Sequence, residues 1–172
     1  MAPPARTAPD LRQDAERLHA AVSQLVRLYQ FRDRDTICCH DISITQCHAL
    51  EALVERGPLR SQALAAALML DKSTTTRVVD ALVRKGYVER RADPDDARAH
   101  ALTVTAPGRR LYRRINEALI DQQVEVLRDL EPGIRDGATE VIRRLTRAAQ
   151  SRLGAGGAVC TPLAADAPSC CD

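Results

Sequence analysis

Aromatic residues are scarce in this chain. Its 172 residues include three tyrosines, one phenylalanine and no tryptophan, although 45% of the sequence is hydrophobic. The core must therefore be built from aliphatic side chains, which favours helices packed on helices. No apolar run approaches the ~18 to 20 residues that a helix needs to span a bilayer. The N-terminal residues lack the apolar core of a signal peptide, so we expect a cytoplasmic protein without a membrane partner.

Cysteines and basic residues, by contrast, are clustered. Six cysteines in a cytoplasmic chain, where thiols are kept reduced, indicate metal, metalloid or redox chemistry before structural disulfides. The net charge is only +2, yet residues 72–114 hold eleven basic and five acidic side chains. This local excess of positive charge predicts a face that binds a polyanion, with a solvated charged surface as the alternative.

Apolar residues at helical spacing, together with capping signals, predict six helices and one hairpin. The predicted helices lie within residues 10–32, 43–57, 61–68, 71–86, 106–130 and 134–153. A turn signal at residues 93–96, between two short extended runs, predicts the hairpin. The order helix, short helix, turn, helix, hairpin is that of a winged helix-turn-helix. The predicted fold is therefore mainly α with a small β wing, in the α+β class.

Two helix starts carry strong local signals. Ser43 and Gln46 have the spacing of a capping box, and Ile42 and Cys47 have the spacing of a hydrophobic staple around it. Asp71 is expected to cap the helix that follows it. These signals place Cys47 in the first turns of its helix, after a connection predicted over residues 33–42.

The stretch "LAAALMLDKSTTTRVVDALVRKGYVERRADPDDARAHALTVTAPGRRLY", residues 64–112, resembles the core of the MarR family of bacterial transcription regulators. The specific parts are residues 71–91 and the Asp-x-Arg of the hairpin, Asp96 and Arg98. A weaker similarity extends over residues 10–153. The resemblance implies a DNA-binding lobe at residues 43–105 and dimerisation helices at residues 10–32 and 106–153. The flanking segments are expected to be a flexible arm, residues 1–9, and a disordered cysteine-containing tail, residues 154–172.

The helix after Asp71 is the expected recognition helix. With Val78, Val79 and Leu82 buried, its opposite face presents hydroxyl and basic side chains that can contact base edges or phosphates. The candidate residues on this face are Lys72, Ser73, Thr74, Thr76, Arg77 and Arg84. For Ser73 and Thr74 the alternative is a role only in starting the helix, and for Arg77 it is an ordinary surface position.

The hairpin supplies two further candidates for contacting DNA. Arg98 is expected to reach a minor groove or a phosphate while Asp96 holds its guanidinium, and a turn ion pair without a DNA role is the alternative. Two positions depart from the family pattern. Ala97 stands where a second arginine is frequent, and Met69 stands in a turn where glycine is common. If that turn requires positive φ, Met69 is strained there.

The segment "TICCHDISITQCHALEAL", residues 36–53, holds the most suggestive thiols. Cys38 and Cys39 cannot form a relaxed disulfide with each other, because adjacent Cα atoms are only ~3.8 Å apart. Together with Cys47 they could bind a soft ion, namely arsenite (As(III)), Cu(I) or Zn. The helix start is expected to favour the Cys47 thiolate. The possible auxiliary ligands are His40, Cys160, Cys170 and Cys171.

These observations predict a homodimeric DNA-binding regulator, expected to be a repressor of a near-palindromic operator, controlled by a soft metal or metalloid at the cysteine cluster. No obligatory cofactor and no enzymatic activity are expected. An alternative keeps the DNA-binding module but makes Cys47 a sensor of oxidants or electrophiles. In a third reading Cys47 is only a small core residue. A thiol-dependent reductase is less favoured, because the sequence shows no nucleotide motif.

Overall fold

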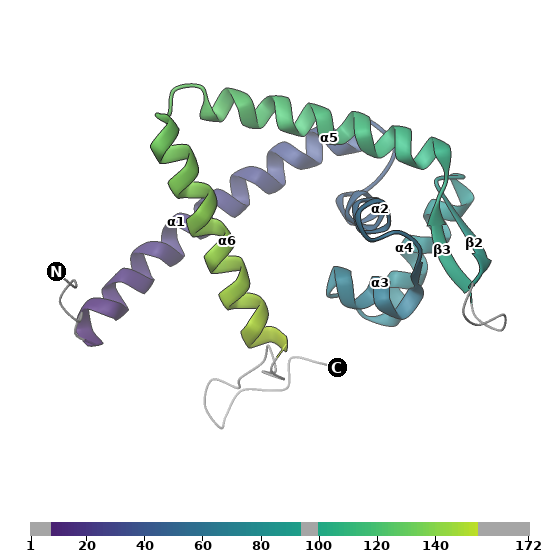
Figure 1. The fold of residues 1–172 in the computed structure, drawn as a ribbon, viewed down its shortest axis with the longest axis horizontal. Helices are drawn as coiled ribbons and strands as arrows, with labels where there is room; N and C mark the ends of the chain where they lie inside the picture. The colour runs from purple at the N-terminus through teal and green to yellow at the C-terminus, as the bar shows by residue number, and fades with distance from the viewer. Residues whose placement is uncertain (1–7, 94–99, 155–172) are drawn as a thin grey trace. The chain divides into compact units, whose positions relative to one another are not determined.

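The computed structural model describes residues 8–93 and 100–154. The chain divides into two compact units, residues 1–122 and residues 123–172. The elements, in chain order, are α1 (Ala8–Cys38), α2 (Ile44–Arg56), β1 (Leu59–Arg60), α3 (Ser61–Leu68), α4 (Lys72–Arg84), β2 (Val88–Ala92), β3 (His100–Val104), α5 (Ala106–Leu127) and α6 (Pro132–Gly154) (Figure 1). The predicted fold class, mainly α with a small β wing, is confirmed. Asp96, Ala97 and Arg98, and the tail cysteines Cys160, Cys170 and Cys171, lie outside the described residues.

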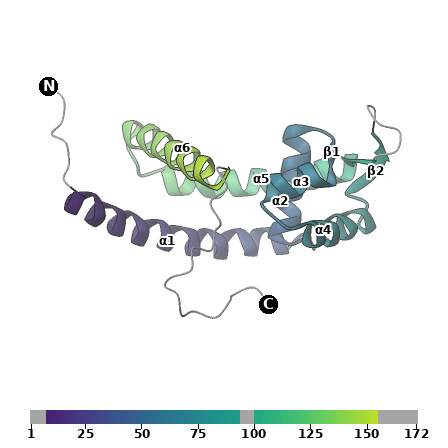
Figure 2. The same ribbon diagram turned by 90° about the horizontal axis from the view of Figure 1, so that it is seen from below.

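The first helix is longer than predicted. It was expected to end near Arg32, but α1 continues to Cys38 as one helix (Figure 2). The polar run after Arg32 looked like a connection, yet its charged residues are compatible with a helix. Burial of Ile37, which is 2% exposed, extends α1 into the core. Cys38 is therefore the last residue of a helix, not part of a link.

The predicted start of α2 is confirmed. Ser43 Oγ accepts a hydrogen bond from the backbone N–H of Gln46, and the Gln46 side chain accepts one from the backbone N–H of Ser43, both at 3.2 Å. Ile42 and Cys47, on either side of this capping box, are both buried in the same apolar core. The helix ends at Arg56, before Gly57, which has a φ of 79°.

The small sheet contains one strand that the sequence did not predict. β2 and β3 form the expected antiparallel hairpin, with Val88 opposite Val104 and Ala92 opposite His100. β1 adds to the other side of β3, so the strand order is β1-β3-β2. Two residues are too short a run to show strand periodicity, which is why β1 escaped sequence analysis.

The first unit has an aliphatic core. It is formed by buried residues of α2, α3, α4, β2, β3 and the start of α5, and it includes Ile37 at the end of α1. Gly108, on α5, is needed there because a Cβ at this position would lie 2.2 Å from the backbone oxygen of Tyr87. Most of α1 instead exposes large apolar side chains. They are Leu11, Leu18, Val22, Leu25, Val26, Leu28 and Phe31.

The predicted interruption after α5 is confirmed, although α5 ends at Leu127 and not near Leu130. α6 begins at Pro132, a position where proline's missing N–H has no partner to lose. The exposed apolar residues of α6 are Ile134, Val141, Ile142 and Leu145. No helix among the described residues is long and apolar enough to cross a membrane.

Candidate DNA-reading face and thiol cluster

Asp71 organises the start of α4. Its carboxylate accepts hydrogen bonds from the Thr74 hydroxyl at 2.6 Å, the Thr74 backbone N–H at 2.8 Å and the Ser73 hydroxyl at 2.7 Å. The hydrogen bonds from Thr74 and Ser73 hold the pKa of Asp71 well below its usual range. The predicted N-cap is therefore confirmed, and it uses more donors than a single capping bond would.

These bonds also decide what the hydroxyls of α4 can offer a ligand. Ser73 and Thr74 donate their protons to Asp71, and Thr76 donates to the Lys72 backbone oxygen at 2.8 Å. A hydroxyl whose proton is used in this way can still accept a hydrogen bond. The helix-start role considered for Ser73 and Thr74 is thus realised, whereas their contact with DNA stays a prediction.

The charged side chains of α4 remain open to solvent. Lys72, Arg77 and Arg84 are exposed and make no ion pair within the described part of the chain. The opposite face is buried as predicted through Val78, Val79 and Leu82. Thr75 is buried as well, and its hydroxyl donates to the Asp71 backbone oxygen at 2.8 Å. One helix face therefore packs on the lobe while a polar and basic face stays free for a ligand.

The turn between α3 and α4 contains the positive φ at Met69 that the sequence analysis considered. Met69 adopts the left-handed conformation, with φ 53° and ψ 43°, and its side chain is 75% exposed. Its backbone N–H bonds to Ala66 at 3.2 Å, and the next N–H bonds to Ala65 at 3.0 Å. A turn that ordinarily favours glycine is therefore occupied by methionine.

Two ion pairs that the sequence did not predict connect the hairpin to neighbouring elements. Arg90 on β2 contacts Asp80 on α4 at 2.5 Å, which ties the hairpin to the recognition helix. Arg60, at the start of α3, makes no side-chain capping bond there and contacts Asp93, just after β2, at 2.6 Å. Only the spacing of opposite charges over 10 and 33 residues hinted at these pairs, and such spacing is not specific.

The three thiols of the 36–53 segment have different surroundings. Cys38 and Cys39 are exposed, and the Cys39 thiol donates to the Asp35 backbone oxygen at 3.1 Å. Cys47 is only 4% exposed. Burial, followed by the nearby charges of Glu51 and Asp33, raises the pKa of Cys47 to about 11. The expectation that the helix start favours the Cys47 thiolate is wrong, because desolvation of the thiol outweighs the helix-end effect.

The described residues do not assemble the predicted metal site. Among them, no three His, Cys, Asp or Glu side chains are placed to hold an ion together. Cys47 faces a small cavity of about 180 Å³ lined by residues of α1, α2 and α5, whereas Cys38 and Cys39 face solvent. His40, the possible nitrogen ligand, follows the exposed pair in the turn after α1.

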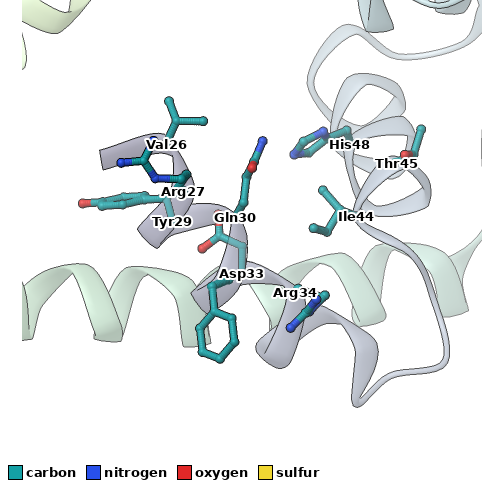
Figure 3. A pocket seen from close by; sticks show the side chains of 10 residues that line it. Val26, Arg27, Tyr29, Gln30, Asp33, Arg34, Ile44, Thr45 and His48 are labelled. Atoms are coloured by element: carbon teal, nitrogen blue, oxygen red, sulfur yellow. The ribbon is translucent and has the colours of Figure 1, made fainter. Parts of the chain in front are cut away.

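A larger cleft lies between α1 and α2, and sequence analysis did not anticipate it. Its volume is about 670 Å³. His48 on α2 and Gln30 on α1 point towards each other across it (Figure 3). Tyr29 and Phe31 supply aromatic rings to its wall, and each has an arginine of α1 above its ring, Arg32 at 4.0 Å and Arg34 at 5.3 Å from the centroid. The cleft combines aromatic surface with polar and charged groups, a composition typical of small-molecule sites.

Comparison with known proteins identifies the family. Residues 42–100 match the model of the MarR family. An uncharacterised HTH-type transcriptional regulator of Mycobacterium leprae, ML2140, is 30% identical over 122 residues, which cover 71% of this chain and 82% of that protein. The chain belongs to the MarR family. The predicted resemblance is thereby confirmed, and this MarR-family chain is a DNA-binding transcriptional regulator rather than an enzyme.

Other relatives agree with this assignment. A protein of Thauera aromatica, named as a regulator of the hcr operon, is 31% identical over 98 residues, and the match spans 57% of this chain and 59% of that protein. The crystal structure of RV1404 from Mycobacterium tuberculosis has a TM-score of 0.66 at 27% identity, with 85% of this chain and 97% of that chain covered. A MarR family protein from Bacillus stearothermophilus, at 23% identity and a TM-score of 0.70 with 85% and 99% covered, shows the same fold.

Proposed function

We propose that this MarR-family regulator is a cytoplasmic homodimer that represses transcription by binding a near-palindromic duplex through α4. The observation that carries the proposal is the exposed basic and hydroxyl face of α4, directly opposite its buried stripe. In a two-fold dimer, two such helices would enter successive major grooves ~34 Å apart. Lys72, Arg77 and Arg84 would then contact phosphates or guanine edges. The predicted contacts from Asp96 and Arg98 belong to the same proposal.

Exposed apolar side chains support the dimer. α1 presents seven large apolar residues to solvent, and α6 presents four. Leaving so much apolar surface in water is unfavourable by about 25 cal/mol per Å², so we expect a second copy to cover it.

The test compares Arg77→Ala with Arg110→Ala. Both arginines are exposed and make no ion pair among the described residues, but Arg110 lies on α5, outside the recognition helix. Duplexes selected from a random pool are titrated at several salt concentrations. We expect Arg77→Ala to weaken binding at least tenfold and, if Arg77 contacts a phosphate, to lower the log–log salt slope by about 0.9. Equal effects from the two variants would remove α4 as the reading face.

We further propose that a thiol-reactive effector releases the DNA by acting at Cys38 and Cys39. Both thiols are exposed and adjacent, so they can bind one soft ion without rearranging the core. Arsenite is the first choice, followed by Cu(I) and by Zn with His40 as an additional ligand. Cys47 is less suited to bind such an ion than the sequence implied, because its thiol is buried and its pKa is raised. The same facts weigh against the alternative in which a Cys47 thiolate senses oxidants.

Single replacements separate these possibilities. Cys38→Ser and Cys39→Ser should leave operator binding intact while weakening release by arsenite, measured by fluorescence anisotropy of labelled duplex. Cys47→Ser is the matched control, and we expect it to respond to arsenite like the parent protein. A chain ending at Leu153 tests the contribution of Cys160, Cys170 and Cys171. If both exposed-thiol variants are released as readily as the parent, the pair is not the effector site.

A further inference from the structure

Lys85 joins two parts of the first unit that the sequence keeps far apart. It follows the last residue of α4, and its own backbone N–H closes that helix onto Ala81 at 3.1 Å. Its ammonium group donates to the backbone oxygen of Asp41, 44 positions earlier in the chain, and lies 3.1 Å from the Asp41 carboxylate. The recognition helix is therefore attached at its C-terminal end to the turn that follows α1.

The turn that receives Lys85 has a defined conformation. Asp41 adopts positive φ, 58°, and its backbone N–H bonds to Cys38 at 3.2 Å. Ile37 before the turn and Ile42 after it are both buried, so the turn is anchored on each side. Aspartate tolerates the left-handed region better than most residues do, but the conformation is uncommon and contacts around the turn favour it. We attribute part of that hold to Lys85.

The backbone oxygen is the important partner in this contact. The Asp41 carboxylate is 94% exposed, and an ion pair this open to water contributes little. The Lys85 side chain is more enclosed, at 29% exposed, and a charged donor on a carbonyl makes a stronger bond than a neutral one. Among the described residues, no other side-chain hydrogen bond or ion pair joins the turn at 39–43 to α4.

We propose that Lys85 is a positioning residue for DNA binding, which holds the end of α4 against the turn that closes α1. Movement of the C-terminal end of α1 then reaches the reading face through this bond, in addition to the core that Ile37 and Ile42 share with the buried stripe of α4. Cys38 and Cys39 stand at that end of α1, so a change at these thiols has a direct route to α4. The proposal rests on the proposed function, because it assigns a role in positioning the DNA-reading helix.

Three variants separate positioning from direct DNA contact. Lys85→Met removes the donor, Lys85→Arg keeps a donor of similar reach, and Asp41→Asn removes only the exposed carboxylate. We expect Lys85→Met to lower operator affinity about tenfold with an unchanged salt slope. Lys85→Arg and Asp41→Asn should each stay within about twofold of the parent. A slope reduced by about 0.9 in Lys85→Met would make Lys85 a phosphate contact and overturn the proposal.

A measurement without DNA keeps this inference apart from the proposed function. Hydrogen exchange at the Asp41 amide reports whether the turn is held. The protection of this amide, measured relative to an unfolded peptide of the same sequence, should fall at least fivefold in Lys85→Met, or in Lys85→Gln if the first variant folds poorly, and stay unchanged in Asp41→Asn. If the parent binds no duplex, the proposed function fails while the exchange result still decides the attachment. Equal exchange in parent, Lys85→Met and Lys85→Gln would show that Lys85 does not hold the turn.

The final measurement tests transmission from the thiols. In a chain with Cys47, Cys160, Cys170 and Cys171 changed to Ser, iodoacetamide modifies only the exposed pair. Modification should weaken operator binding in this parent and have a smaller effect when Lys85→Met is added, because the attachment is already lost. The loss of binding free energy on modification is compared between the two backgrounds, and the difference is the coupling energy of a double-mutant cycle. Identical losses in both backgrounds would mean that the thiols and α4 communicate by another route.

Discussion

Met69→Gly should stabilise the protein, because Met69 occupies a backbone conformation that suits glycine. An L-residue in the left-handed region is disfavoured by roughly 1–2 kcal/mol, and glycine removes that penalty. Glycine also gives the unfolded chain more freedom, which offsets about 0.5–1 kcal/mol of the gain. The side chain is 75% exposed, so its removal uncovers little apolar surface. The expected net gain is about 0.5–1 kcal/mol.

Met69→Ala is the matched control, since alanine keeps the backbone penalty and removes most of the side chain. We expect its stability to lie within about 0.5 kcal/mol of the parent. A gain of ~1 kcal/mol raises the Tm of a protein of this size by roughly 2–4 °C, which differential scanning calorimetry resolves. Operator affinity of both variants should match the parent. A glycine variant less stable than the alanine variant would refute the argument from backbone strain.

Three further outcomes are expected. Removing the chain after Leu130 should abolish the dimer in sedimentation, because it deletes the exposed apolar residues of α6, and a truncated chain that stays dimeric would place the interface elsewhere. The pKa of Cys47 is raised to about 11 and that of Tyr112 to about 12, in both cases mainly by burial. The stability that these two neutral groups contribute should therefore be full below about pH 8, where both are neutral in the folded and the unfolded state, and decline as pH rises towards 12; a flat alkaline profile in urea unfolding would contradict this. Asp71→Ala should melt at a lower temperature than Asp71→Ser, because serine can still cap α4, and equal melting temperatures would count against the cap.

Much of the lobe could be predicted from local sequence. Capping depends on residues that are close together in the sequence. The starts of α2 and α4 could therefore be predicted from Ser43 with Gln46 and from Asp71. The buried stripe of α4 follows from helical periodicity alone. A departure from the family pattern, methionine in place of a common glycine, drew attention to the turn at Met69, and its φ of 53° meets the condition under which strain was expected there. The exposed basic face then follows, because the residues opposite a buried stripe face solvent.

Other features depended on contacts between distant residues. α1 continues past Arg32 because Ile37 finds a place in the core, which no local signal revealed. Three cysteines close together in sequence were read as one cluster, yet folding buried Cys47 and left Cys38 and Cys39 in solvent. Desolvation, a property of the packed lobe, reversed the expected pKa shift of Cys47. The attachment of Lys85 to Asp41 spans 44 positions, so only the tertiary structure brings the recognition helix to the end of α1.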